Sequence, residues 1–288
     1  MSDQSSAAEN HEQEPRSFLG VIVHSFFIIP FLIVVFCLLL FTAIHLLTSE
    51  NQTAYEYLED VKVGGLSKRW QAAFELSKLL AHPKQVPHEQ RFVNEMLTAF
   101  KQSEHDDPRV RQYLALAMGR MGSPEFFEAL RANIKSEKEE NLYAIIYALG
   151  MLKDKRAVAV LEPFLKHEQA RIRSCAVVAL GSIGTDPVKE LLKRSLTDSE
   201  PNVQWGSAIS LAQLGDNSGR DVLAQLLDRD YLAKFSEVDP QELNQLMIAA
   251  IEAIQHVQDQ DLRRRVQELG VSDHNMKVRA AALESIKR

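Results

Sequence analysis

The sequence contains few of the residues that stabilise small disulfide-linked or zinc-binding proteins. Its 288 residues include only two cysteines, Cys37 and Cys175, which are too few for a Cys-based zinc site or a disulfide framework. An excess of positive charge is also missing, because 33 Lys and Arg face 39 Asp and Glu, a formal net charge of −6. Dedicated nucleic-acid binders carry a basic surface, so this balance argues against a nucleic acid as the partner.

Short catalytic motifs are missing as well. The sequence has no G-x-x-x-x-G-K-[ST] phosphate loop, no G-x-S-x-G nucleophile elbow and no Cys-His pair at a recognisable spacing. We therefore predict no catalytic, cofactor-binding or metal-binding residue and no small-molecule substrate. On these grounds we expect that the chain is not an enzyme.

One long hydrophobic run is present near the N-terminus. Residues 18–47 carry no charge, and a membrane span needs about 20 apolar residues. The preceding residues 1–17 form a polar, acidic tail, unlike the basic start of a cleaved signal peptide. We predict an uncleaved transmembrane helix, 18–47, kinked at Pro30. His24 and His45 near its ends are interpreted as interfacial polar residues rather than as a proton or metal site.

The charges on either side of this run bear on its orientation. Only Arg16 precedes it, whereas Lys62, Lys68 and Arg69 follow it. The positive-inside rule then favours a cytoplasmic location for the larger, C-terminal part of this single-pass membrane protein. Asn51 begins a glycosylation sequon, which has meaning only if that segment is luminal in a eukaryote.

Beyond residue 66 the sequence repeats with a fixed period. Gly122, Lys153, Gly184 and Gly215 are separated by 31 residues each. Each of these residues follows a block with small or aliphatic side chains at helical spacing, and a second amphipathic stretch comes after it. The first blocks are 110–119, 141–150, 172–181 and 203–212, and the second stretches are 125–134, 156–165, 188–196 and 220–227. Two helices per period joined by short turns are typical of an α-solenoid.

The repeated residues resemble HEAT repeats, in particular the short HEAT-like type first noted in phycobilisome lyases. Asp107-Pro108-Arg109-Val110-Arg111 through Gly122 matches the family pattern, and Ala170–Gly184 matches it nearly as well. We expect an all-α fold: about six HEAT-like helix pairs plus a terminal half-repeat in an α-solenoid, residues 67–288, preceded by a single transmembrane helix. Residues 48–66 are predicted to be a juxtamembrane connector, with a short interfacial helix that ends at Gly64-Gly65. The resemblance to membrane-anchored bacterial HEAT proteins favours the bacterial inner membrane.

The resemblance also gives an expectation for four arginines at one repeat position. In the family, such arginines pair with acidic residues of the adjacent repeat, which we favour over a row of anion-binding residues. The four are Arg69, Arg111, Arg173 and Arg279. Some HEAT enzymes, the deoxyhypusine hydroxylases, bind two irons with repeated His-Glu dyads inside helices. Here His88-Glu89 and His167-Glu168 fall outside the aligned inner-helix blocks, so we predict no metal.

Two departures from the repeat are candidate partner-binding elements. A 12-residue insertion near Arg229–Pro240 interrupts the period, and insertions in solenoids emerge as loops that often take part in recognition. It offers Tyr231, Leu232 and Phe235 as contacts, or it forms a short helix that packs them onto its own repeat. In addition, the position after the Val-Arg pair holds Trp70, Tyr143 and Trp205, which form either a binding ridge or contacts between helices.

The function that best fits these features is a noncatalytic, membrane-anchored scaffold or adaptor. Its solenoid surface would bind a protein partner. The alternative is an accessory or regulatory subunit of a membrane enzyme or transporter complex, contacted through the transmembrane helix.

Overall fold

The computed structural model describes residues 24–48, 52–135 and 137–287. The chain divides into two compact units, Met1–Gln52 and Thr53–Arg288, which are described separately below. The second is called the repeat unit.

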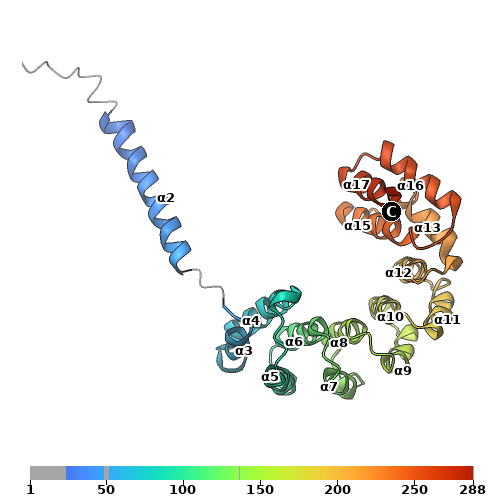
Figure 1. Ribbon diagram of the computed structural model, residues 1–288, viewed down its shortest axis with the longest axis horizontal. Coiled ribbons are helices and arrows are strands. Elements are labelled where there is room, and N and C mark those ends of the chain that lie inside the picture. The colour runs from blue at the N-terminus through green and yellow to red at the C-terminus, as the bar shows by residue number, and fades with distance from the viewer. Residues whose placement is uncertain (1–23, 49–51, 136, 288) are drawn as a thin grey trace, which may run out of the picture. The chain divides into compact units, whose positions relative to one another are not determined.

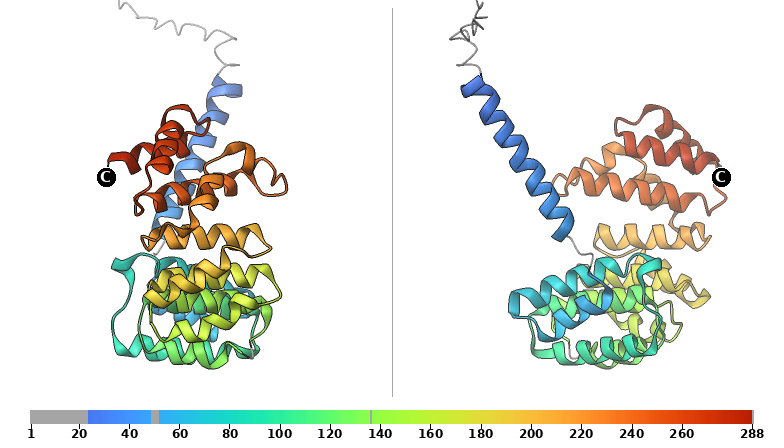
Figure 2. Two further views of the ribbon diagram at one scale, coloured as in Figure 1. Left: turned by 90° about the vertical axis from the view of Figure 1, so that its right-hand side faces the viewer. Right: turned by 60° about the vertical axis from the view of Figure 1, so that its left-hand side comes forward.

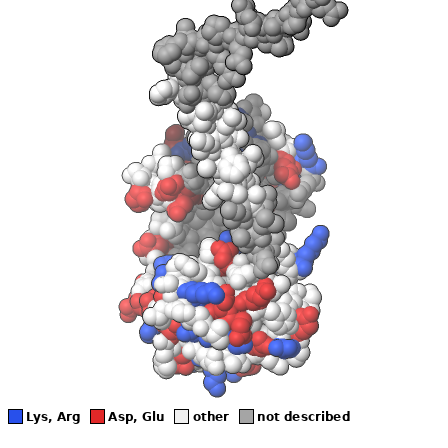
Figure 3. Space-filling view, turned by 90° about the vertical axis from the view of Figure 1, so that its left-hand side faces the viewer, with Lys and Arg blue, Asp and Glu red and all other residues white. Residues whose placement is uncertain are grey.

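The first unit contains one long apolar helix. A π-helical turn, His24–Ile28, leads into α2, Ile29–Thr48. The window Phe26–Ala43 has a mean hydropathy of 3.0, and none of it is buried. It contains no charged residue and forms an uncharged surface in Figure 3. By length and composition alone, this helix is a candidate membrane span. The predicted tail 1–17, the start of the predicted span and the Asn51 sequon lie outside the described residues, as do the side chains of His24 and His45.

The repeat unit consists of helices in two layers, and its described residues include no β-strand, which confirms the predicted all-α solenoid (Figure 1). The inner layer is α4 (Leu66–Leu79), α6 (Pro108–Met121), α8 (Glu139–Met151), α10 (Ala170–Ile183), α12 (Pro201–Gln213), α15 (Pro240–Ile254) and α17 (Met276–Lys287). The outer layer is α3 (Ala54–Val63), α5 (Gln90–Gln102), α7 (Phe126–Asn133), α9 (Ala157–Leu161), α11 (Asp186–Ser195), α13 (Arg220–Leu226), α14 (Arg229–Leu232) and α16 (Gln260–Ser272). Short 3₁₀ turns occur at Pro83–Gln85, Ser103–His105, Glu162–Lys166 and Asn217–Gly219.

Each inner helix packs against the next inner helix along the chain, from α4 through to α17. The views in Figure 2 show these helices stacked one above another, and Figure 1 shows that within the repeat unit the inner layer lines the concave side of an arc. Apolar side chains fill the space between the layers in two clusters. The first cluster runs from Ala54 to Leu211 and the second from Trp205 to Ala282.

Local sequence signals explain where the inner helices begin and end. Asp107 and Asp239 each precede a proline, and their carboxylates accept hydrogen bonds from the backbone N–H two residues later, at 3.0 and 2.6 Å. Proline suits the first helical position because its missing N–H has no partner there in any case. The 31-residue period marks the helix ends. Among the described residues, positive φ occurs at Gly122, Lys153, Gly184 and Gly215, the predicted helix stops.

Glycine also sets how closely adjacent inner helices approach. At Gly150, an added Cβ would lie 2.5 Å from the Cα of Ala179 on the next inner helix. Gly119 and Gly181, 31 residues before and after Gly150, face Ala148 and Ser210 in the same way. The repeat therefore specifies a close backbone contact between consecutive inner helices from α6 to α12.

The N-terminal boundary of the repeat unit differs from the prediction. A helix does form in the predicted connector 48–66, but α3 packs against α4 and α5, with Leu58 0% and Val61 1% exposed. The cause is local. Thr53 and Glu56 form a capping box that starts α3, and its apolar face then meets the core rather than a membrane interface. The repeat unit begins at Thr53, so that α3 is added to the six pairs and half-repeat expected from residue 67.

Candidate functional site: a trough on the concave face

Arginine–carboxylate pairs join consecutive repeats. Arg111 donates from Nε to Glu137 Oε2 at 2.6 Å, and their side chains are only 3% and 6% exposed. Arg173 donates from Nε and Nη2 to the two oxygens of Asp198, both at 2.8 Å. Each carboxylate lies just before the next inner helix. These contacts support the structural ladder over an anion-binding row, because the guanidinium groups already have carboxylate partners.

The first and the last ladder arginines, Arg69 and Arg279, bind different kinds of partner. Arg69 pairs with Asp106, which precedes α6. Arg279, on the last described inner helix, instead donates to the backbone oxygen of Asp273 at 2.5 Å.

Hydrogen bonds from Arg173 hold the pKa of Asp198 below its usual range, so this carboxylate stays charged at neutral pH.

Trp70 and Tyr143, two of the predicted ridge residues, form contacts between repeats. The guanidinium of Arg109 lies 4.2 Å from the ring centroid of Trp70, and that of Arg171 lies 4.4 Å from the ring centroid of Tyr143. In both pairs the arginine comes from the next inner helix. The Tyr143 hydroxyl also donates to Gln112 Oε1 at 2.7 Å. Both aromatic rings are half-buried, and their role in binding a partner stays a prediction.

Trp205 and the insertion pack against each other. Residues 229–232 form the short helix α14, and the Trp205 Nε1–H donates to the Tyr231 hydroxyl at 3.2 Å. The Phe235 ring meets Trp205 edge-on, with 4.8 Å between centroids. Trp205 is 3% and Leu232 2% exposed, whereas Tyr231 and Phe235 are half-buried. The insertion thus takes the packed arrangement, the second of the two alternatives, and recognition by these four residues is an open prediction.

A trough that the sequence analysis missed runs along α12, between α10 and α15. It has a volume of about 560 Å³ and lies on the side of the inner helices turned away from the outer layer. Val178 on α10, Ile209 on α12 and Leu246 on α15 supply its apolar walls. Gly206 and Ser210 supply a floor with little side chain. Its volume is within the range of about 300–1,000 Å³ that is typical of small-molecule and cofactor pockets.

The trough belongs to a longer apolar row with the period of the repeat. Leu116, Tyr147, Val178 and Ile209 lie 31 residues apart, each on a successive inner helix. Tyr147 and Val178 are exposed. This spacing is the sequence signal that could have located the surface, because helix positions shared by all repeats form a continuous row in a solenoid.

Two charged residues and one thiol border the trough. Arg171 stands at its α10 side and Glu242 at its α15 side, and among the described residues neither forms an ion pair. Cys175 also lines it. Burial raises the pKa of the Cys175 thiol, against an opposing effect of Arg171, so the group is protonated at neutral pH and is a poor nucleophile.

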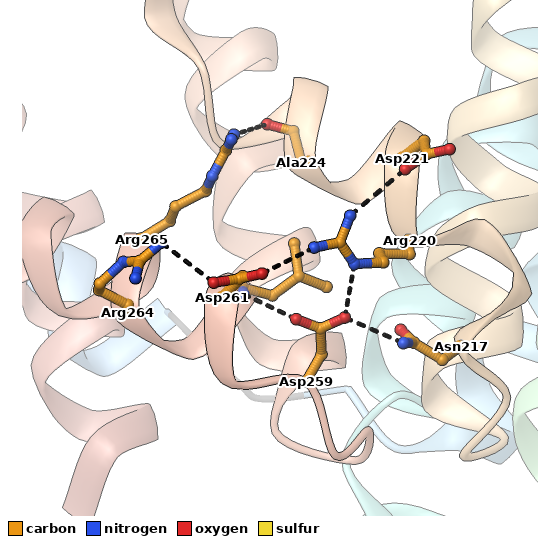
Figure 4. Close-up of polar contacts among 9 residues, drawn as sticks. Asn217, Arg220, Asp221, Ala224, Asp259, Asp261, Arg264 and Arg265 are labelled. Atoms are coloured by element: carbon orange, nitrogen blue, oxygen red, sulfur yellow. Dashed lines mark hydrogen bonds and ion pairs between the residues drawn. The ribbon is translucent and has the colours of Figure 1, made fainter.

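Two basic clusters lie on the outer layer, one around Lys193 on α11 and one at residues 263–265 on α16, and both contact acidic residues nearby. Lys193 pairs with Glu190 at 2.9 Å and with Asp216 at 3.1 Å. Figure 4 shows the second cluster, in which Arg220 donates to Asp259 at 2.8 Å and to Asp261 at 3.0 Å. Arg264 and Arg265 of the basic run 263–265 join it by donating to Asp261 and to the Ala224 carbonyl. Positive and negative side chains are also interspersed on the face drawn in Figure 3.

The His-Glu pairs of the sequence are not arranged as a metal site. His88-Glu89 and His167-Glu168 both lie in loops, before α5 and α10 respectively. The ring of His167 stacks on Phe164, and its Nδ1 accepts a hydrogen bond from the Gln169 N–H. Within the described residues, no group of three or more His, Cys, Asp and Glu side chains lies close enough together to hold a metal ion. The described side chains therefore do not fit a di-iron centre built from His-Glu dyads.

Comparison with known sequences identifies the repeats. A family model described as HEAT repeats matches residues 93–181, 134–199 and 164–235. The chain contains HEAT repeats. An α-solenoid of HEAT repeats is suited to protein binding or scaffolding.

Solved structures with a similar arrangement of helices have low sequence identity to this chain. One chain of the complex of CpcE and CpcF of phycocyanin lyase from Nostoc sp. PCC7120 aligns over 83% of the present chain. The alignment covers 96% of that chain, at 17% identity and a TM-score of 0.45. Human deoxyhypusine hydroxylase in complex with glycerol aligns with 81% of this chain and 88% of its own, at 17% identity and a TM-score of 0.37.

A curated relative corrects one expectation. Deoxyhypusine hydroxylase from Eremothecium gossypii is 35% identical over 107 residues, which cover 36% of this chain. The matched region spans 33%, about a third, of that protein's length. The expectation that the chain is not an enzyme is contradicted by this match to an enzyme. It rested on missing motifs for phosphate binding and nucleophilic catalysis, and on the position of His88-Glu89 and His167-Glu168 outside the aligned inner-helix blocks.

Proposed function

We propose that the chain is a single-pass membrane protein whose HEAT repeats bind a protein partner through the concave trough. The observation that carries this proposal is the trough. Exposure of its apolar wall at Val178 to water is unfavourable, as is that of Tyr147 on the adjacent helix α8, and a bound partner would cover this surface. The helix α2 supports the membrane anchor by its length and its lack of charge. The lysines and arginine after it favour a cytoplasmic location of the repeats.

The two halves of this proposal have separate tests. For the anchor, the full chain and a variant without residues 18–47 are expressed and their membranes floated on a density gradient. We expect the full chain to float with the membranes after alkaline extraction and the shortened chain to remain in the soluble fraction. If alkali extracts the full chain from the membranes as readily as the shortened chain, residues 18–47 do not span the membrane.

For the partner, a photo-crosslinking amino acid replaces Val178 in the full chain in its native membranes. We expect a covalent adduct with one protein, absent when the same group replaces Val271, which is 82% exposed on α16 and lies outside the trough. Equal adducts at both positions, or none at Val178, would remove the trough from the proposal. Adducts obtained only from positions in α2 would favour the alternative of a membrane-complex subunit.

The match to deoxyhypusine hydroxylase favours a second candidate function, an enzyme that hydroxylates deoxyhypusine or a related side chain. Its test is direct. The purified full chain is incubated with molecular oxygen, iron, a reductant and a protein that carries deoxyhypusine, and the product is examined by mass spectrometry. A gain of one oxygen atom per deoxyhypusine would establish this activity, and an unchanged mass alongside an active control hydroxylase would remove it.

A further inference from the structure

The trough has the dimensions of a seat for a single α-helix. On α10 its lining extends from Ala170 to Ser182, and on α12 from Asn202 to Gln213. At 1.5 Å per residue these stretches are about 16–18 Å long, or about three helical turns. Adjacent helices pack about 8–10 Å apart, so α10 and α15 stand roughly 16–20 Å from each other on either side of α12. These are distances between helix axes, so about 4–10 Å of clear space is left between the two wall helices. A helix would therefore lie over α12 with its apolar side chains, rather than its backbone, between the walls.

The side chains of the trough suit close packing of a helix. Its lining residues on α12 are spaced like one face of a helix, with Trp205, Ile209 and Gln213 four residues apart. Gly206, one residue after Trp205, has no side chain, and Ser210 has a small one. An α-helix can approach such a surface closely and place its own apolar side chains against Val178 and Leu246.

The backbone chemistry also favours a helix over an extended peptide. The trough is formed by α-helices, whose backbone N–H and C=O groups are already paired within each helix. An extended peptide would place its own N–H and C=O groups against the apolar walls without backbone partners, which is costly. A helix satisfies these groups internally and offers only side chains.

The charges at one end specify the occupant further. Arg171 and Glu242 stand near the N-terminal ends of α10 and α15, on opposite sides of the trough. Neither forms an ion pair among the described residues, although the Arg171 guanidinium also lies over the Tyr143 ring. Four other arginines and lysines of the repeat unit do pair with carboxylates: Arg111, Arg173, Lys193 and Arg220. An occupant with an acidic side chain toward Arg171 and a basic one toward Glu242 would complement both.

From these observations we propose that the trough binds one amphipathic α-helix of about three turns. The helix presents apolar residues at positions i, i+3 or i+4, and i+7 to α12, an acidic side chain to Arg171 and a basic side chain to Glu242. This inference rests on the proposed function of partner binding, and it names the kind of segment by which the partner is held.

The test begins with a displayed library of random peptides about 15 residues long, selected on the full chain in detergent micelles. We expect the selected sequences to share the helical spacing of apolar residues and to carry an acidic and a basic residue near one end. Their affinity for the full chain is then measured by fluorescence anisotropy. A proline placed in the centre of the peptide should abolish binding, because it breaks the helix.

Two variants of the chain and one matched control locate the binding site. Val178→Glu should weaken peptide binding more than tenfold, whereas Val271→Glu, which adds the same charge at an exposed position outside the trough, should leave it unchanged. Arg171→Glu should weaken binding about fivefold or more, and changing the acidic residue of the peptide to lysine should restore it. Circular dichroism and melting temperatures show whether each variant keeps the fold.

Each contrary result has a defined meaning. Selection of no peptide, selection of peptides without the helical spacing, binding that tolerates the central proline, or equal binding to Val178→Glu overturns the helix proposal. If one of these results is obtained while crosslinking at Val178 still captures a partner in native membranes, the proposed function stands and only the helix is wrong. If crosslinking at Val178 also captures nothing, binding of a partner through the trough fails as well.

Discussion

Arg229 of the insertion forms an ion pair with Asp273, in the role that a ladder arginine has at other junctions between repeats. It donates from Nε and Nη2 to the two carboxylate oxygens, both at 2.8 Å, and its Nη1 reaches Asn244 Oδ1 at 2.7 Å. Asp273 precedes α17, just as Asp198 precedes α12. The ladder position of α15 holds Met247, which has no charge to offer. The insertion therefore supplies the cation that the repeat sequence lacks at this junction.

Removal of this cation should destabilise the C-terminal repeats. The Asp273 side chain is 1% exposed, so Arg229→Met leaves a buried carboxylate without its partner. We expect the free energy of unfolding to fall by about 3 kcal/mol, measured by urea denaturation of the full chain. Adding Asp273→Asn to Arg229→Met should recover part of the loss, because it removes the uncompensated charge.

Arg131→Met is the matched control for this substitution. Arg131 pairs with Glu128 on the surface of α7, where both side chains are more than half exposed. Exposed pairs contribute about 0–1 kcal/mol, so its stability should remain close to that of the original chain. If the two arginine variants lose the same stability, the Arg229–Asp273 pair does not join the insertion to α17 energetically.

Asp198 makes the stability of the repeat unit depend on pH. Hydrogen bonds from Arg173 lower the pKa of Asp198 in the folded state, so its contribution to stability is complete above the unfolded pKa of about 3.9. The contribution is lost as the pH falls through the lower, folded pKa. In urea titrations at pH 7, 5, 4 and 3, Asp198→Asn should therefore be the less stable chain at pH 7, and the difference should shrink below about pH 4. Asp186→Asn, at a carboxylate exposed on the first turn of α11, should follow the original chain throughout.

Gly150→Ala should separate α8 from α10. The new methyl group would lie 2.5 Å from the Cα of Ala179, and a backbone atom cannot move aside as a flexible side chain can. Overpacking of this kind costs about 1–3 kcal/mol, to be measured as a loss of unfolding free energy. At Gly65 a Cβ meets no atom within 4 Å, so Gly65→Ala serves as the control and should change stability little. A neutral Gly150→Ala would show that the helices are not held at this distance.

Lys153→Gly should stabilise the chain. Lys153 is the only described non-glycine residue with positive φ, at 54°, a conformation that costs side chains with a Cβ. Glycine removes this strain but adds freedom to the unfolded chain, and we expect a net gain of roughly 0.5–1 kcal/mol. Lys155→Gly, two residues later at a position without positive φ, should bring no gain in the same thermal or urea measurement.

The sequence predicts the helices better than the surface between them. The helix stops and the two-layer arrangement follow from the 31-residue period, and the arginine ladder follows from the resemblance to HEAT repeats, because each depends on contacts that recur at one repeat position. The packing of α3 does not follow, since its apolar face at Leu58 and Val61 suits a membrane interface and a protein core equally well. The trough depends on the spacing of three helices and on small residues at Gly206 and Ser210. The 31-residue spacing of Val178 and Ile209 could have located the apolar row, but the depth of the trough between α10 and α15 is shown only by the assembled fold.

The division of the core has a consequence for how the array bends. The two apolar clusters meet at α12, where Val203 and Leu211 belong to the first and Trp205, Ala208 and Ala212 to the second. In a solenoid each repeat contacts mainly its neighbours, so a change in curvature is absorbed where the packing between clusters is weakest. A molecule lying along α12 would touch α10 in one cluster and α15 in the other. Binding there and the curvature of the repeat unit at α12 would then be coupled, each favouring the state in which the other is most stable.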